Sequence, residues 1–480
     1  MSICKNFFRY FLVFSLALIW PLCISTLAQA KTYYVAKDGS DSNPGTETWP
    51  WLTIKKAADT MSPGDTVYVK AGTYSGVGLQ ISGTPGNYIS YLAYPGDTVK
   101  VGQFYFYNGV SFIKVDGFDF ANGNIECSGG NNNGNIFRNN LIHSGSGSGV
   151  DFGIAKDNIV ENNEIWNVGH GVHTSGSTSG TIVKGNVIHD CYLHGLGMVG
   201  GIGEKYLNNI IYNCTKTGIH PGSGNPSKGE IKGNLVYNCG MSAIMLSGSG
   251  FLVENNTGIS QNGAQYETYY ISGSDHVVRN NIGYREDGVS YVLLISQSAI
   301  TDYNDWYDPK NPKCISRWYN PMTLSEYQAY GQGAHSISED PKFVNVAGND
   351  FHLQPDSPCI GAGQNGVDMG AYGYRESRLP SEKVELRNRP NPFRAGKEET
   401  LIEYDLKQPS NVTITIYDLL GQEVWHKAYR AGENGGNWAN SIPWDGRNLS
   451  GEVVANGGYI CRIWVESENK YIVRKIAVAK

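Results

Sequence analysis

The stretch that decides the fold is Ile136-Phe137-Arg138-Asn139-Asn140-Leu141-Ile142, in which two apolar pairs flank an Asn-Asn step. The same arrangement recurs along the middle of the chain, with Gly-Asn in place of Asn-Asn in some copies. The second polar residue of each copy is Asn140, Asn163, Asn186, Asn209, Asn234, Asn256 or Asn281. The intervals are 23, 23, 23, 25, 22 and 25 residues, and Gly117 lies 23 residues before Asn140. So regular an interval indicates a repeat protein.

Each interval holds short apolar strands separated by glycines, which is typical of one coil of a parallel β-solenoid. The apolar pairs are β-branched and too short for a helical face, and the pattern of leucine-rich repeats is absent. The 60 glycines in 480 residues and the 17% of charged residues favour strands and tight turns. We therefore predict an all-β fold, a solenoid with ~23-residue coils in which stacked asparagines bond each other and the bends of adjacent coils.

The same alignment gives further columns. Three residues after each ladder asparagine stand mostly aromatic residues: His143, Trp166, His189, Tyr212, Tyr237, Ile259 and Tyr284. Packing between coils explains this column more simply than stacking against sugars does. Two residues before the ladder, Arg138, Glu161 and Lys184 begin a column of mixed charge that predicts a solvated surface. Cys191, Cys214 and Cys239 fall in register and predict a column of buried thiols rather than a metal site.

The first thirty residues are predicted to be a signal peptide. Lys5 and Arg9 precede an apolar run from Phe11 to Trp20, and Ala28-Gln29-Ala30 is a small-x-small cleavage site. The run is shorter than the ~20 residues that a membrane span needs. We expect a secreted protein with seven remaining cysteines, an odd number that cannot all pair within one chain. The net charge of −6 and the lack of a basic run argue against nucleic acid as a partner.

One strand of each coil offers a column of outward residues. The inward residues are Ile125, Val150, Val172, Leu196, Ile219 and Ile244. The residues that follow them point outward, about 4.8 Å apart: Glu126, Asp151, His173, Gly197, His220 and Met245. Gly197 is expected to leave an open notch between the two histidines. His170 and His194 stand just before the strand at matching positions, where the alternation turns them inward unless the bend lies there.

The chain resembles a known family at both ends of the repeat region. After the signal peptide come Thr32-Tyr33-Tyr34-Val35-Ala36-Lys37-Asp38-Gly39, then Pro63-Gly64-Asp65-Thr66-Val67, then Ala93-Tyr94-Pro95-Gly96. These segments resemble the start of secreted right-handed parallel β-helix proteins, including the family 9 polysaccharide lyases, or pectate lyases. The segment from Thr53 to Met61 resembles the short helix that caps their first coil, and Asp340 to Tyr372 resembles their closing segment. The resemblance implies a β-helix domain over residues 31–375.

A second pattern follows a charged stretch, residues 376–388, that we predict to be a linker. Val412-Thr413-Ile414-Thr415-Ile416 alternates with period two, and Trp444-Asp445-Gly446 and Gly457-Gly458-Tyr459 come after it. Residues 389–480 resemble the small immunoglobulin-like C-terminal domain, of FlgD-like or type IX sorting type, that ends many secreted bacterial enzymes. The resemblance implies contact with a secretion machinery or a cell surface; a plain spacer domain is the alternative. We expect a bacterial protein, extracellular or attached to the cell surface, and a monomer.

The outward column suits the chemistry of a sugar acid. Elimination across a uronate ring needs a base for the C5 proton and a cation or donor for the carboxylate. His173 is the best base, Asp151 and His220 complete the catalytic set, and His170, His194 and Lys216 are predicted to bind substrate. Glu126 and Asp151 stand where family 9 lyases carry calcium-binding aspartates, so they could hold Ca²⁺; no other cofactor is expected. The family's adjacent Asp pair is replaced by Gly147-Ser148, and its lysine base by His173.

The leading hypothesis is a secreted polysaccharide lyase that acts on an acidic polysaccharide by β-elimination. Two alternatives stay open. A glycoside hydrolase on the same scaffold would use two carboxylates across a groove, as Glu126 and Asp151 could. A non-catalytic solenoid would bind glycan or serve in surface adhesion without turnover.

Overall fold

The computed structural model describes residues 30–127, 129–175, 177–199, 201–223, 226–261, 263–295, 299–372, 386–406, 410–430, 435–436, 439–468 and 470–479. The signal peptide predicted for residues 1–30 lies outside the described residues except for Ala30, as does the predicted linker up to residue 385. No helix in the described part of the chain has the length and apolar character that crossing a membrane requires.

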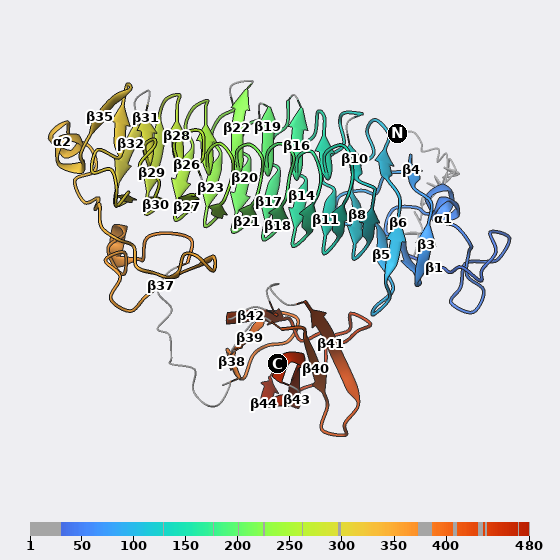
Figure 1. Cartoon of the computed structure of the whole chain (residues 1–480). Helices are drawn as coiled ribbons and strands as arrows, with labels where there is room; N and C mark the ends of the chain where they lie inside the picture. Colours follow the sequence, from blue (N-terminus) through green and yellow to red (C-terminus); the bar gives the residue numbers. More distant parts are fainter. Residues whose placement is uncertain are drawn as a thin grey trace, which may run out of the picture.

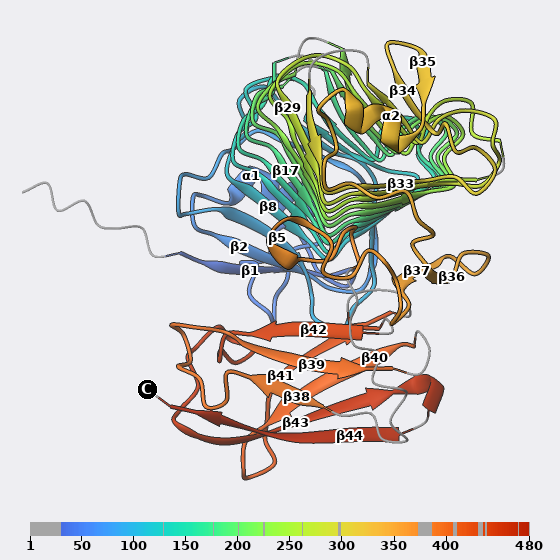
Figure 2. The same ribbon diagram turned by 90° about the vertical axis from the view of Figure 1, so that its left-hand side faces the viewer.

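Three long parallel sheets wind into a solenoid, and each full coil adds one strand to every sheet (Figures 1 and 2). Along the chain a coil passes through sheet A, then sheet B, then sheet C. Sheet A consists of β1 (Thr32–Val35), β2 (Thr66–Val69), β5 (Ile89–Ala93), β8 (Ile113–Asp116), β11 (Ile136–Arg138), β14 (Ile159–Glu161), β17 (Ile182–Lys184), β20 (Lys205–Leu207), β23 (Glu230–Lys232), β26 (Leu252–Glu254), β29 (His276–Arg279) and β32 (Ala299–Asp302).

Sheet B consists of β3 (Gly72–Tyr74), β6 (Val99–Val101), β9 (Asp119–Ala121), β12 (Leu141–His143), β15 (Glu164–Trp166), β18 (Val187–His189), β21 (Ile210–Tyr212), β24 (Leu235–Tyr237), β27 (Thr257–Ser260), β30 (Ile282–Arg285) and β33 (Asp305–Tyr307). Sheet C consists of β4 (Val77–Leu79), β7 (Phe104–Phe106), β10 (Ile125–Cys127), β13 (Val150–Phe152), β16 (Val172–Ser175), β19 (Leu196–Val199), β22 (Ile219–Ser223), β25 (Ile244–Leu246), β28 (Tyr269–Ile271), β31 (Leu293–Ile295), β34 (Ile315–Arg317) and the antiparallel β35 (Asn320–Met322). The predicted solenoid fold is confirmed.

The predicted asparagine ladder fills the bend between sheets A and B. In each rung the next asparagine accepts two bonds; Asn163, for example, donates its main-chain N–H and its Nδ2 to Oδ1 of Asn186, both over 2.9 Å. The buried ladder runs from Asn140 to Asn281 as predicted and continues to Asn304, where Tyr303 replaces the preceding asparagine. Each rung thus satisfies the buried N–H of the neighbouring bend, which keeps successive coils in register.

The other columns also form. The inward residues of sheet C, among them Val150 and Val172, are fully buried. On sheet A the charged column forms surface ion pairs, such as Lys184 with Glu161 at 2.8 Å and Arg279 with Glu254 at 2.7 Å. The three cysteines of the predicted thiol column are buried and free, and the neighbouring thiols and burial raise the pKa of Cys214.

Short elements cover the ends of the solenoid. The helix α1 (Ile54–Thr60) buries Ile54, Ala57 and Ala58 against the first coil, and Thr53 caps it by accepting the N–H of Lys56. The last coils carry α2 (Leu324–Ala329). The closing segment, with β36 (Phe343–Asn345) and β37 (Asp350–Leu353), does not cap the end; it packs its apolar side chains onto the outer face of sheet B beside Leu235 and Ile282.

Residues 386–479 fold as a β-sandwich with a core of its own (Figure 2). One sheet has β38 (Arg387–Arg389), β39 (Thr400–Asp405) and β42 (Ala439–Trp444); the other has β41 (Glu423–Tyr429), β40 (Val412–Tyr417), β43 (Gly457–Val465) and β44 (Lys470–Val478). The alternating pattern predicts strands here, and the resemblance implies a small immunoglobulin-like domain; its role in sorting stays a prediction.

Candidate functional site

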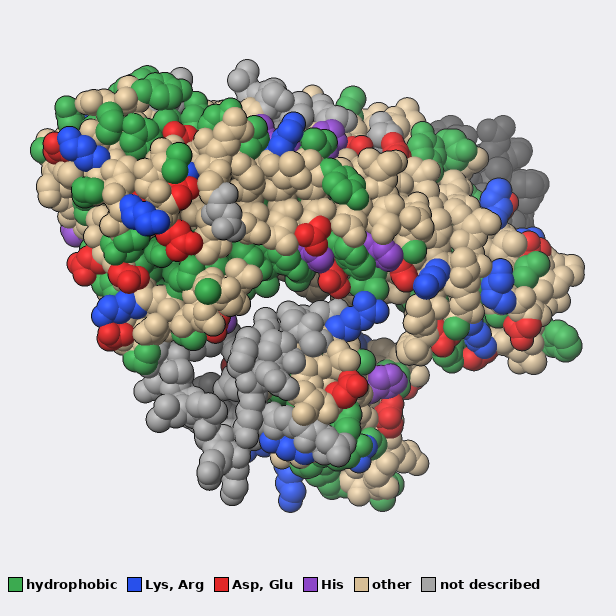
Figure 3. Space-filling view, in the orientation of Figure 1, with side chains coloured by type: hydrophobic (Ala, Val, Ile, Leu, Met, Phe, Trp, Pro, Cys, Tyr) green, Lys and Arg blue, Asp and Glu red, His purple; other side chains and the backbone are tan. Residues whose placement is uncertain are grey.

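The outer face of sheet C carries the predicted column in strict register. Glu126 pairs with Asp151, Asp151 with His173, His173 with Gly197, and Gly197 with His220. Because parallel strands repeat every 4.8 Å or so, residues that are far apart in the sequence become close neighbours. Histidine and acidic side chains gather along the upper edge of the solenoid in Figure 3.

Asp151 and His173 form the central pair of this face. The Oδ1 atom of Asp151 lies 3.1 Å from Nδ1 of His173, and both side chains are about three-quarters buried, with 24% and 21% of their surface exposed. An ionised carboxylate only accepts hydrogen bonds, so Nδ1 of His173 donates and Nε2 keeps a lone pair. Asp151 thereby fixes the tautomer in which His173 can accept a proton.

His170 and His194 lie in the bend before β16 and β19, so the alternation does not turn them into the core. The ring of His170 stacks on that of His173 with 4.7 Å between centroids and on that of His194 with 5.4 Å. His194 in turn lies 4.7 Å from His220. The four imidazoles therefore form one cluster, and both predicted substrate-binding histidines join the outward column.

The predicted notch at Gly197 is not open. A Cβ atom at this position would lie 2.4 Å from Nδ1 of His170, so the imidazole of His170 occupies the space that the missing side chain leaves. The expectation of an empty notch was wrong because it considered only the strand, and not a bend residue leaning over from the neighbouring coil.

Burial keeps three of these imidazoles neutral. Desolvation, aided by the charge of His173, lowers the pKa of His170 to about 4. Desolvation, the largest cause, lowers the pKa of His194 to about 3. Desolvation, followed by the nearby Lys216 ammonium, also lowers the pKa of His220. Lys216 contributes to all three shifts, so the predicted substrate-binding lysine lies beside the cluster.

Glu126 and Asp151 do not by themselves make a calcium site. Oε2 of Glu126 accepts from Nε2 of Gln103 over 3.1 Å and from Nδ2 of Asn124 over 3.4 Å, while Asp151 is bonded to His173. Within the described residues, no three His, Cys, Asp or Glu side chains converge as metal ligands would. Ca²⁺ takes six to eight oxygen ligands, so the two carboxylates would have to be joined by backbone carbonyls and waters to hold the ion. Calcium binding, inferred from two carboxylates on adjacent coils and from the family resemblance, stays a prediction.

Histidine–carboxylate pairs also occur in this chain away from the candidate site. His143 lies 3.0 Å from Asp119 on sheet B, and His335 lies 2.8 Å from Asp302 near the end of the solenoid. What distinguishes His173 is its surroundings, because its ring stacks on that of His170 and so belongs to the cluster of four imidazoles. Perturbed titratable groups that gather on one face are typical of functional sites.

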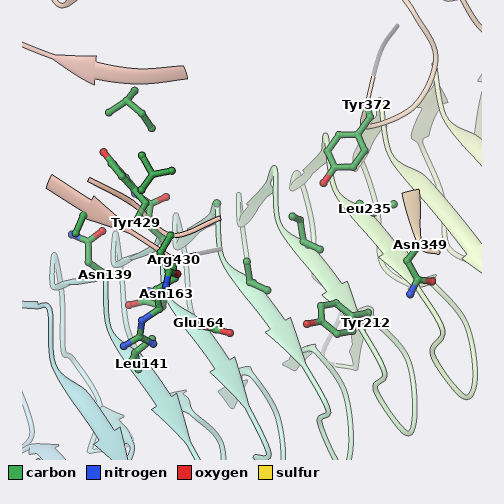
Figure 4. Close-up of a pocket in the computed structure, with 18 of the residues that line it drawn as sticks. Asn139, Leu141, Asn163, Glu164, Tyr212, Leu235, Asn349, Tyr372, Tyr429 and Arg430 are labelled. Carbon is green, nitrogen blue, oxygen red and sulfur yellow. The ribbon is translucent and has the colours of Figure 1, made fainter. Parts of the chain in front are cut away.

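A cavity of about 1180 Å³ lies against a different face, sheet B (Figure 4). Its labelled residues include Glu164 and Tyr212 from sheet B, Tyr372 at the end of the closing segment, and Arg430 from the C-terminal domain. The two walls belong to separately folded parts, and the chain that joins them, residues 373–385, lies outside the described residues. The candidate site is therefore the outer face of sheet C, which consecutive coils build together.

Sequence reasoning missed residues that shape this face. Gln103 and Asn124 hold Glu126, and Tyr105 precedes Glu126 in the outward register. Tyr105 could have been found, since it lies one coil before Glu126 and obeys the same alternation. The contacts of the Gln103 and Asn124 amides could not have been predicted. Both residues lie just outside the strands, where the alternation does not determine the direction of a side chain.

The three stacked parallel sheets define a parallel β-helix. The chain belongs to the family described as "Pel9A-like, right handed beta helix region", whose model matches residues 33–285. This match confirms the right-handed β-helix resemblance.

Several solved structures are similar to this chain. The pectate lyase Pel9A aligns with a TM-score of 0.51 at 17% identity, over 72% of this chain and 96% of the lyase. A rhamnogalacturonan lyase gives a TM-score of 0.43 at 17% identity, over 68% and 96%. The GH136 lacto-N-biosidase from Eubacterium ramulus gives 0.47 at 13% identity, over 65% and 67%. At 17% identity the likeness to Pel9A extends to the fold alone. No curated protein matches the chain in sequence.

Proposed function

We propose that this chain is a polysaccharide lyase that cleaves an acidic, uronate-containing polysaccharide by β-elimination on the outer face of sheet C. The observation that carries the proposal is the hydrogen bond from His173 to Asp151 within the cluster of partly buried imidazoles. Membership of the Pel9A-like β-helix family supports the same class of chemistry.

In the proposed reaction His173 is the base. Nε2 takes the proton from C5 of the uronate, the C4–C5 double bond forms, and the C4–O4 bond breaks. The proton then held by His173 is available to the departing O4 oxygen. Asp151 stabilises the imidazolium that exists between these events, in the way that a carboxylate supports a histidine base elsewhere.

The remaining groups bind rather than exchange protons. Lys216 supplies a positive charge for the uronate carboxylate, whose charge grows as the C5 proton leaves. Burial lowers the pKa of His170, His194 and His220, so all three act as neutral hydrogen-bonding groups. For His220 this favours substrate binding over the acid role, because a neutral imidazole is a poor proton donor.

The proposal is tested with the full chain on polygalacturonate and alginate, each with added Ca²⁺ and with a chelator. Ultraviolet absorbance of the unsaturated product reports elimination, and reducing-end release without that absorbance would instead indicate the hydrolase alternative. Binding without either product would indicate the adhesion alternative. The chelator arm also tests the calcium prediction.

His173→Ala is expected to lower kcat about 10²- to 10⁴-fold, because the proton acceptor is removed. Asp151→Asn should also lower kcat strongly. The imidazole of His173 stays in place, but the amide no longer fixes the tautomer in which Nε2 can accept a proton. His143→Ala is the matched control, because it removes a histidine with the same kind of carboxylate partner from sheet B. Equal losses in the His173 and His143 variants would contradict the assignment of the site to sheet C.

A further inference from the structure

The hairpin that joins β34 to β35 exposes two large aromatic rings at its tip. Arg317 pairs with Asn320, so Trp318 and Tyr319 form a two-residue turn. Their side chains are 59% and 68% exposed. Soluble proteins do not need such rings at a loop tip, and neighbouring exposed aromatics indicate a binding surface.

The backbone of this turn is strained. Trp318 and Tyr319 have φ values of 55° and 60°, in the left-handed region that bulky residues rarely adopt. A two-residue hairpin turn with two positive φ angles favours Asn-Gly. Strain that a simple change of sequence would relieve is typically retained for function, so the two rings have a use that outweighs their cost in stability.

The hairpin reaches back to the face that carries the candidate site. The hydroxyl of Tyr319 lies 3.2 Å from that of Tyr270 on β28. Tyr270 belongs to the same outward column as His173, four strands further along sheet C, or about 19 Å away. Apolar side chains gather over β31 to β35 at the upper left of Figure 3.

A cation accompanies these rings. The guanidinium of Arg317 lies 5.3 Å from the ring centre of Tyr330, which is itself 59% exposed. An arginine fork matches the geometry of a carboxylate, and flat rings match the apolar faces of sugars. Together these groups suit a sugar acid better than a neutral sugar.

The aromatic column on sheet B offers a useful contrast. There Tyr212 stacks on His189 at 4.7 Å with an angle of 1° between planes, and on Tyr237 at 5.0 Å with 11°. Each ring face in that column is covered by its neighbour, so only edges are left for a ligand. The rings of the hairpin tip have no such neighbour in the ring contacts of the described chain, apart from the Tyr319–Tyr270 hydroxyl contact.

We propose that the hairpin platform, defined as Tyr270, Trp318, Tyr319 and Tyr330 with Arg317, is a glycan subsite. It binds distal units of the acidic polysaccharide whose reacting unit lies at His173. The inference rests on the proposed function and deepens it. It implies that the enzyme binds a long polysaccharide at sugar units distant from the bond that it cleaves.

The decisive variant is the double substitution Trp318→Asn and Tyr319→Gly, which removes both rings and gives the turn its favoured sequence. Binding is measured with oligouronates too short to span the ~19 Å from His173 to Tyr270, and with oligouronates of about twice that length. The long ligands should bind about three- to tenfold more weakly per ring lost, and the short ligands unchanged. The melting temperature should rise, because the strain is relieved.

Trp49→Ala is the matched control, since it removes an exposed tryptophan, 62% accessible, from the N-terminal loop. Trp318→Asn alone serves if the double variant folds poorly. If the parent binds and cleaves long ligands and the double variant binds them equally well, the platform is overturned and the proposed lyase activity stands. If the parent binds long ligands without cleaving them and the variant binds them more weakly, the platform is upheld and the proposed lyase activity is overturned. A parent that binds no uronate overturns both.

Discussion

Gly197 decides how the imidazole cluster is arranged. Its neighbours in the column carry side chains, and only the absence of one here lets His170 lean across from the preceding bend. The close approach, rather than an unusual backbone angle, is what requires glycine at this point. The residue thus sets the geometry of a site to which it contributes no functional group.

Gly197→Ala is expected to lower kcat/KM about 10- to 100-fold, because the added methyl group would displace His170 from the cluster. Thermal unfolding should change little, since the ring can turn outward. Gly147→Ala is the control, as a Cβ there meets nothing within 4 Å. Full activity in the Gly197 variant would show that the position of His170 does not matter for turnover.

At the scale of the element, the asparagine rungs connect each coil to the next. Asn186 is fully buried and joins three rungs at once: its Oδ1 accepts from Asn163, and its Nδ2 donates to Oδ1 of Asn209. A buried donor without an acceptor costs about 1 to 3 kcal/mol, whereas a normal bond contributes less. The ladder is therefore most sensitive to the loss of an interior rung.

Asn186→Ala should lower the free energy of unfolding by about 3 kcal/mol, because it leaves the buried N–H of Asn163 without its acceptor. Urea unfolding of the full chain measures the change. Asn167→Gly serves for comparison, since Asn167 is exposed and its φ of 51° suits glycine; its effect should stay within about 0.5 kcal/mol. Similar losses at both positions would argue against a special role for the ladder.

The strands could be predicted from the sequence, whereas the bends and turns could not. The spacing of the asparagines predicts the coils, and the alternation along β13 and β16 predicts that Asp151 and His173 face outward as neighbours. Bends and turns follow no such rule. The lean of His170 over Gly197, the closing segment on sheet B and the aromatic hairpin tip depend on contacts between coils that no period encodes.

At the scale of the whole molecule, one buried carboxyl couples the solenoid to pH. Glu204 is 1% exposed in the bend between sheets C and A, and burial raises its pKa to about 7. Its pKa is ordinarily 4.5, so the folded chain holds this proton more tightly than the unfolded chain does. The resulting stability is complete below about pH 4.5 and is lost as the pH rises through about 7.

Glu204→Gln should remove this dependence, because the amide stays neutral at every pH. Relative to the parent, the variant should gain up to about 3 kcal/mol in free energy of unfolding between about pH 5 and about pH 8. Urea unfolding at both values measures the difference. Parallel pH profiles for parent and variant would show that Glu204 is ionised in the folded chain or that its environment admits water.

Within the three sheets, each coil pairs only with the coil before it and the coil after it. Duplication of a single coil between His220 and Tyr270 would therefore move the hairpin outward by one strand spacing and leave the histidines as they are. The length of polymer that this scaffold spans can therefore change in whole-coil steps during evolution, while the histidine cluster and the hairpin keep their sequences.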